Sequence, residues 1–114
     1  MEASTALVVP IGKDNDVFTA IFEFDVTPEQ QERMKTELPN IVSTVVSQQP
    51  GFVSNNLHCS LDGEKVYNYF QWESEAHFKA FRADEAVQAK VMAVIGPYNP
   101  KPRPFEIVFT KVGA

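Results

Sequence analysis

The dipeptide Asp62-Gly63 is the feature that most constrains what this chain can fold into, because Asp-Gly is a strong signal for a tight β-hairpin turn. The segments on either side of it, residues 52–61 and 66–72, have the composition of strands. A helical pattern and a further strand-like segment flank this hairpin on each side. The predicted order is therefore β-α-β-β-α-β, which is typical of a ferredoxin-like α+β fold with an antiparallel sheet.

The first helix is predicted from the signals at its N-terminus. Thr27 is the predicted N-cap, Pro28 occupies the first helical position and Gln30 completes a capping box. Apolar side chains then recur at helical spacing and are expected to face the sheet: Met34, Leu38, Ile41, Val42, Val45 and Val46. The strand before this helix is predicted over residues 17–25.

The second half of the chain is predicted to hold more helix and one last strand. A helical region begins after Ser74, and a further helix begins at Asp84. Four prolines in residues 97–104 predict an extended connection, and residues 105–111 are predicted to form the last strand.

The size and charge of the chain limit its organisation and its partners. A chain of 114 residues predicts one domain, which we assign to residues 17–114 after an N-terminal arm of residues 1–16. A net charge of −5 argues against binding to nucleic acid or to an anionic membrane. No stretch approaches the ~18 apolar residues of a membrane span. The one cysteine, Cys59, cannot form an internal disulfide and fits a reducing cytoplasm.

The strands carry apolar or aromatic residues on both sides, as in the segment that holds Phe105, Ile107, Val108 and Phe109. Helices can cover only one face of such a sheet, and an exposed apolar face is unfavourable in water. We therefore expect a homodimer in which two sheets pack face to face.

Asn68 and Trp72 are the most informative candidates for a functional site. In a strand, alternation places them on one face with Val66 and Phe70. An amide beside a large aromatic side chain, on an otherwise apolar face, suits the binding of a flat ring that carries an oxygen atom. The same pattern also fits an ordinary core, in which the amide is hydrogen-bonded to its neighbours and the tryptophan only fills space.

Three segments of the chain resemble the antibiotic biosynthesis monooxygenase family of dimeric α/β-barrel proteins. These segments are Pro50-Gly51-Phe52-Val53-Ser54, His58-Cys59-Ser60-Leu61-Asp62-Gly63 and Asn68-Tyr69-Phe70-Gln71-Trp72-Glu73-Ser74. The last of them is similar to the small cofactor-free, quinone-forming oxygenases of aromatic polyketide pathways. The resemblance implies a monooxygenase that oxidises a small aromatic or polyketide-like phenol with molecular oxygen.

The resemblance also implies roles for individual residues. Asn68 would bind the developing oxyanion through its amide N–H, and Trp72 would position the aromatic ring. His58 is the candidate base, because histidine accepts protons near neutral pH, and a surface or dimer-interface role is the alternative. We expect an apolar pocket between the sheet and the helices. The candidates for its substrate-binding walls are Phe22, Phe24, Phe70, Phe78 and Phe81.

The chain departs from the family pattern at Phe78, where relatives carry a tyrosine, and later in the helical segment, where the neighbourhood of Lys90 replaces a basic residue of the relatives. We expect no metal, since there are only two histidines and no His/carboxylate spacing. The resemblance implies no haem, because haem-degrading monooxygenases of the same fold need a histidine ligand on the second helix, and residues 84–95 contain no histidine. We expect no nucleotide or flavin, because no glycine-rich phosphate loop is present. The alternatives are a non-oxidative isomerase or cyclase and a non-catalytic ligand-binding or stress-response dimer.

Overall fold

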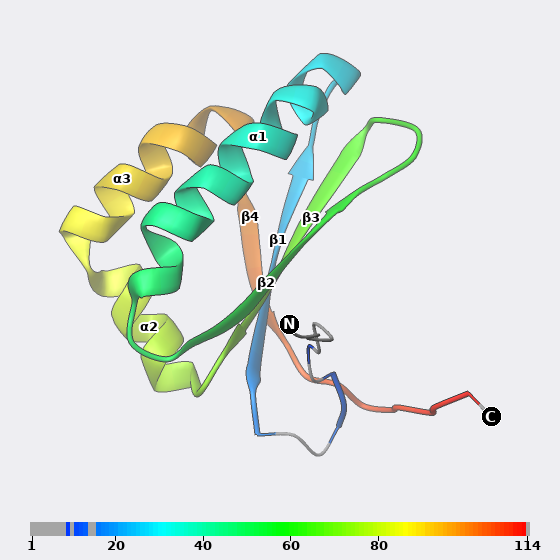
Figure 1. The fold of residues 1–114 in the computed structure, drawn as a ribbon, viewed down its shortest axis with the longest axis vertical. Helices are drawn as coiled ribbons and strands as arrows, with labels where there is room; N and C mark the ends of the chain where they lie inside the picture. The colour runs from blue at the N-terminus through cyan, green and yellow to red at the C-terminus, as the bar shows by residue number, and fades with distance from the viewer. Residues whose placement is uncertain (1–8, 10, 14–15, 114) are drawn as a thin grey trace, which may run out of the picture.

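The structure, a computed structural model, describes residues 9, 11–13 and 16–113. It shows a four-stranded antiparallel sheet with helices packed on one face (Figure 1). The strands are β1 (Phe18–Asp25), β2 (Phe52–Cys59), β3 (Lys65–Trp72) and β4 (Lys101–Phe105), in the spatial order β2-β3-β1-β4. The helices are α1 (Pro28–Thr44), α2 (Glu75–Ala83) and α3 (Glu85–Ile95), with 3₁₀ turns η1 (Val46–Gln48) and η2 (Gly96–Tyr98). This arrangement confirms the predicted ferredoxin-like α+β fold. Most of the predicted arm over residues 1–16 lies outside the described residues.

The N-terminus of α1 has the predicted capping box. The backbone N–H of Gln30 donates to Thr27 Oγ1 at 3.2 Å, and the backbone N–H of Thr27 donates to Gln30 Oε1 at 2.9 Å. The predicted apolar stripe faces the sheet, and all its members except the partly buried Val45 are buried: Met34, Leu38, Ile41, Val42 and Val46. The stripe therefore fixes the side of α1 that covers the core.

The predicted hairpin joins β2 to β3 through a turn in which Gly63 has a φ of 82°, a conformation that favours glycine. One irregularity in this hairpin changes which side chains share a face. A β-bulge between Phe52 and Ser54 places Phe52 opposite Trp72, but Ser54 opposite Gln71. Phe52 therefore lies on the helix-covered face, whereas Ser54 and the residues two and four positions beyond it lie on the other face.

The prediction for the last strand was wrong. The strand that pairs with β1 is Lys101–Phe105, inside the proline-rich segment, and residues 106–113 continue beyond the sheet without regular structure (Figure 1). Prolines are tolerated here because β4 is an edge strand and needs hydrogen-bond partners on one side only. Pro102 and Pro104 are two positions apart, so their missing N–H groups fall on the same side of the strand.

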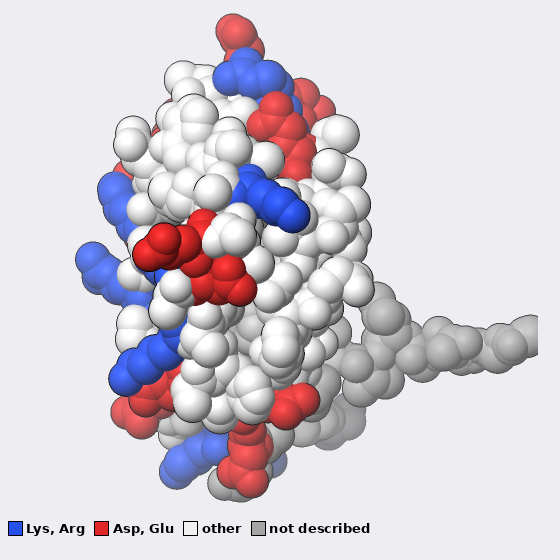
Figure 2. All heavy atoms as spheres, turned by 90° about the vertical axis from the view of Figure 1, so that its left-hand side faces the viewer, with Lys and Arg blue, Asp and Glu red and all other residues white. Residues whose placement is uncertain are grey.

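An ion-pair cluster at one end of the sheet joins β1, β3 and β4. Asp25 accepts hydrogen bonds from Lys101 at 2.7 Å and from Lys65 at 2.5 Å. These two bonds lower the pKa of Asp25 to about 2. Elsewhere, basic and acidic side chains are interspersed on the helix-covered side of the molecule and form no single-sign patch there (Figure 2). In the part of the chain that the structure describes, no helix is both long and apolar enough to cross a membrane.

Candidate active site

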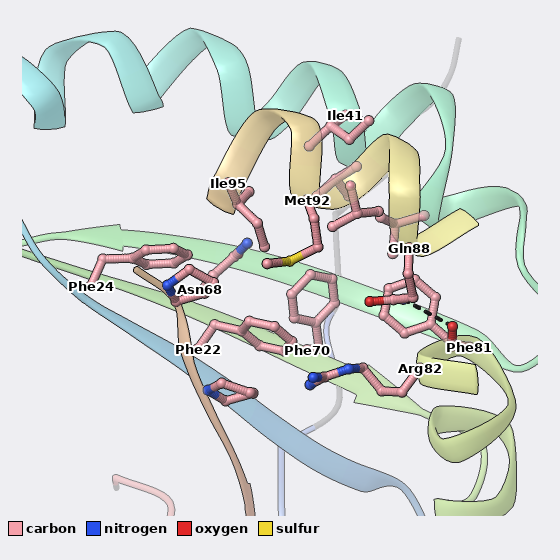
Figure 3. A pocket seen from close by; sticks show the side chains of 15 residues that line it. Phe22, Phe24, Ile41, Asn68, Phe70, Phe81, Arg82, Gln88, Met92 and Ile95 are labelled. Atoms are coloured by element: carbon pink, nitrogen blue, oxygen red, sulfur yellow. Dashed lines mark hydrogen bonds between the residues drawn. The ribbon is translucent and has the colours of Figure 1, made fainter. Parts of the chain in front are cut away.

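A pocket lies between the helix-covered face of the sheet and the helices above it (Figure 3). Its cavity has a volume of about 110 Å³. Phe22 and Phe24 of β1 and Phe70 of β3 line its sheet side, and Phe81 of α2 lines one end. The opposite wall consists of apolar side chains of α1, η1 and α3: Ile41, Val42, Val46, Val91, Met92 and Ile95. Four of the five phenylalanines predicted to form walls therefore line the pocket.

Asn68 brings a buried amide into this apolar pocket. Its side chain is 4% exposed and lines the cavity from the centre of β3. Asn68 Oδ1 accepts a hydrogen bond from Asn55 Nδ2 at 2.5 Å. Asn55 can reach it because the bulge in β2 sets Leu57 opposite Asn68 and Asn55 diagonally across from it. This bond fixes the orientation of the Asn68 amide, so its Nδ2 group is the donor available to a molecule in the pocket (Figure 3).

Two further polar side chains, both absent from the sequence prediction, line the pocket. Gln88 Nε2 donates to the backbone carbonyl of Phe81 at 2.9 Å, which leaves its Oε1 as an acceptor (Figure 3). Arg82, from the last turn of α2, also lines the pocket, and it is solvent-exposed. Helical spacing could have indicated Gln88, because it lies three residues before Val91 on the buried side of α3. No sequence signal marked Arg82.

Trp72 and Phe78, which the sequence placed in the site, are not among the described residues that line the pocket, and their contact with a substrate stays a prediction. Trp72 is 0% exposed and lies behind the lining residues Phe70 and Phe81, with ring centroids 6.4 and 4.9 Å away. Phe78 packs outside the pocket, with its ring centroid 6.1 Å from that of Trp72 and 5.4 Å from that of Phe18. Trp72 Nε1 is buried without a hydrogen-bond partner among the described residues. Trp72 therefore supports the pocket wall rather than forming it.

His58 and Lys90 also lie away from the pocket. His58 is paired with Tyr67 on the sheet face opposite to Asn68, and it is exposed. Its ring Nδ1 lies 3.2 Å from the backbone carbonyl oxygen of Asn56. From this face of its own sheet, His58 does not reach a molecule in the pocket, and its role as a base stays a prediction. Lys90 is exposed on α3 outside the pocket lining, and the cation beside the pocket is Arg82 instead.

No carboxylate or imidazole is among the described residues that line the pocket. Within the same described residues, no group of three or more His, Cys, Asp or Glu side chains is arranged to hold a metal ion. The pocket therefore offers an amide donor, an amide acceptor and one cation in apolar surroundings. Such a set binds an apolar ring compound through its oxygen atoms and favours an anionic oxygen over a neutral one.

The fold and the pocket define a ferredoxin-like α+β protein with a small, mainly apolar pocket between its sheet and its helices. The model of the antibiotic biosynthesis monooxygenase family matches residues 17–91, and the chain belongs to this family. This membership confirms the family that the sequence motifs indicated.

Relatives from streptomycetes share this fold. The chain is 39% identical over 92 residues to the tetracenomycin-F1 monooxygenase of Streptomyces glaucescens, covering 81% of this chain and 82% of that protein. The monooxygenase from the gene ActVA-Orf6 of Streptomyces coelicolor, solved in complex with nanaomycin D, is 25% identical with a TM-score of 0.73. That match covers 85% of this chain and 92% of the solved chain. SnoaB of Streptomyces nogalater, a cofactor-independent oxygenase, is 20% identical with a TM-score of 0.67, covering 84% and 97% of the two chains.

Proposed function

We propose that this protein is a cofactor-independent monooxygenase that oxidises an aromatic, polyketide-like phenol with molecular oxygen. The observation that carries the proposal is the buried Asn68 amide, oriented by Asn55 so that it can donate into an apolar pocket. The family and the relatives support the reaction class, since two of those relatives are monooxygenases and the third is an oxygenase.

The reaction requires the phenol to become electron-rich before it meets oxygen. Loss of the phenolic proton gives a phenolate, which can transfer an electron to O₂ and then combine with the reduced oxygen at a ring carbon. Loss of water from the resulting hydroperoxide leaves a quinone. One oxygen atom of O₂ enters the ring and the other leaves as water, so the substrate itself supplies all the electrons and no external reductant is consumed.

The pocket residues favour the ionised form of the substrate. Asn68 Nδ2 is placed to donate to the phenolate oxygen, and a donor in apolar surroundings acts more strongly than one in water. Gln88 Oε1 can accept from a second hydroxyl group and thereby orient the ring. Because no described lining residue is a carboxylate or an imidazole, we propose that the proton leaves to water. The pH dependence then follows the ionisation of the substrate.

The decisive experiment measures the fate of oxygen. With an anthrone as the phenol equivalent, we expect one O₂ consumed for each anthraquinone formed, in a chelator-treated enzyme without added flavin. With ¹⁸O₂, the quinone should carry one labelled atom, because the mechanism places one oxygen atom in the ring. Heat-denatured protein is the control that subtracts spontaneous oxidation. Conversion of the substrate under strict anaerobiosis to a product of unchanged oxidation state would instead indicate an isomerase or a cyclase, and tight binding without turnover would indicate a non-catalytic ligand-binding protein.

We also propose that the protein forms a homodimer through the uncovered sheet face and the segment that follows β4. The end of β4 and the segment after it are rich in exposed apolar side chains: Phe105 is 48% exposed, Val108 69%, Phe109 75% and Val112 79%. Such a cluster is unfavourable in water and is typical of a protein–protein contact. The single Cys59, which has no disulfide partner, supports a cytoplasmic location for this dimer.

The dimer is tested by replacing one of these apolar side chains. We expect light scattering after size exclusion to give twice the mass of one chain, and we expect Phe109→Ser to shift the population toward monomer. Leu61→Ser is the matched control, because Leu61 is fully exposed at 107% but lies in the hairpin turn, far along the chain from this segment. A monomeric wild-type protein, or equal dissociation of both variants, would refute this interface.

A further inference from the structure

Arg82 is the only charged side chain among the described residues that line the pocket. Its guanidinium carbon lies 5.6 Å from the ring centroid of Phe22 and 5.9 Å from that of Phe78. Both distances are within the range of cation–π attraction, so the two rings hold the guanidinium in place. The Arg82 side chain lies along the pocket (Figure 3). Because Arg82 is exposed while Asn68 is buried, Arg82 marks the rim of the pocket and Asn68 marks its interior.

The charge of Arg82 has no ion-pair partner among the residues that the structure describes. None of the ion pairs between described residues includes Arg82, whereas four surface lysines are paired: Lys35 with Glu32, Lys65 with Glu23 and Asp25, Lys79 with Glu75, and Lys101 with Asp25. The chain as a whole carries a net charge of −5, and its helix-covered side has no basic patch (Figure 2). An unpaired guanidinium beside an apolar pocket is therefore a local feature, and its planar fork suits an anionic oxygen group.

The pocket is too small to enclose a large ligand, so part of such a ligand would lie outside the pocket, near Arg82. A cavity of about 150 Å³ holds one benzene molecule, and this cavity measures about 110 Å³. A compound with several fused rings cannot be enclosed in it. One ring edge can approach Asn68, and the remaining rings must extend through the rim, where Arg82 and Met92 are the exposed lining side chains.

We propose that Arg82 forms an anion subsite, so that the natural substrate is a multi-ring phenol with an anionic oxygen substituent on the part that projects from the pocket. This inference rests on the proposed oxygenase function, because only an enzyme has a substrate. The binding of an anion at Arg82 does not itself depend on turnover. The substituent is a carboxylate or an ionised acidic phenol, which offer the same anionic oxygen to the guanidinium. Arg82 acts as a specificity-determining residue and takes no part in the transfer of oxygen.

The test measures binding of quinones that cannot react further, by isothermal titration calorimetry. The probes are anthraquinone-2-carboxylate, its methyl ester and 2-hydroxyanthraquinone. The acid and the ester share a ring system and differ in charge. We expect the wild-type protein to bind the acid about tenfold more tightly than the ester, the usual scale of one charge-assisted contact. The Arg82→Met variant should lose this preference and keep its affinity for the ester, and Arg82→Lys should keep part of the preference.

Lys79→Met is the matched control, because it removes a charge from the same helix at a residue outside the pocket. It should leave the preference intact. Equal wild-type affinity for acid and ester, failure of the acid to bind, or a preference that survives in Arg82→Met would overturn the subsite. The hydroxyanthraquinone tests whether an ionised phenol binds at Arg82 as a carboxylate does. If its affinity rises as its hydroxyl group ionises, and if this rise is lost in Arg82→Met, phenolates are ligands of the subsite alongside carboxylates. An acid preference in a protein that consumes no oxygen would retain the subsite and reject the oxygenase.

Discussion

Replacement of Asn68 by alanine is expected to lower kcat/KM for a phenol substrate by about 10²–10³-fold, the usual loss when one oxyanion donor is removed. Asn68 is 4% exposed, and its Oδ1 is already engaged by Asn55, so Nδ2 is the group that can meet the substrate oxygen. Water cannot replace this donor efficiently in a pocket lined mainly by apolar side chains. The measurement is the initial rate of oxygen consumption over a range of anthrone concentrations.

Two further variants separate loss of the donor from loss of packing. Asn68→Asp keeps the shape of the side chain and the acceptor for Asn55, but when ionised it presents an acceptor where the amide presented a donor. We expect it to be as slow as Asn68→Ala at pH values at which the carboxyl group is ionised. Asn55→Ala leaves the Asn68 amide in place but free to rotate, so a smaller loss is expected. Circular dichroism should show that all three variants remain folded.

His58→Ala is the control on the opposite side of the sheet. His58 pairs with Tyr67, away from the pocket, so its removal should leave kcat/KM within a few-fold of the wild-type value. A large loss in His58→Ala together with unchanged activity in Asn68→Ala would contradict the site. That result would restore the histidine as the base and move the reaction to the other sheet face.

Much of the fold could be predicted because its local signals agree with its tertiary structure. The capping box at Thr27 and Gln30 and the Asp62-Gly63 turn act over a few residues, and each was found as predicted. The last strand was misplaced because strand propensity favours Phe105 and the residues after it over a segment with alternate prolines. Edge position overrides that propensity, and a sequence alone does not show which strand will lie at an edge.

The site was predictable only in part, because some of its features depend on a strand irregularity and on contacts between elements that are distant in sequence. Strict alternation correctly placed Asn68 and Phe70 on one face of β3. In β2, strict alternation would place Phe52 and His58 on the same face. The bulge after Phe52 shifts the alternation by one residue and puts these two side chains on opposite faces. Arg82 was missed because its role depends on two rings from different elements, Phe22 of β1 and Phe78 of α2. Contacts between elements distant in sequence leave no spacing pattern to find.

Replacement of Trp72 by alanine is expected to lower the free energy of unfolding by about 3–5 kcal/mol, the usual cost of removing a large buried aromatic side chain. Trp72 is 0% exposed and its ring packs against Phe52, Phe70, Phe78 and Phe81. This loss is a large part of the total stability of a small domain. Urea denaturation should be followed by circular dichroism and not by tryptophan fluorescence, because the protein has no other tryptophan.

Trp72→Phe distinguishes a packing role from a chemical one. The substitution keeps an aromatic ring in the cluster and removes an N–H group that has no partner among the described residues, so the void it leaves is partly offset by the loss of an unsatisfied donor. We expect a much smaller loss of stability than in Trp72→Ala, with kcat/KM within a few-fold of wild type. A stable Trp72→Phe protein that has lost activity about 100-fold would contradict the packing role. The indole N–H would then have to reach the substrate, which requires Phe70 or Phe81 to move aside when the substrate binds.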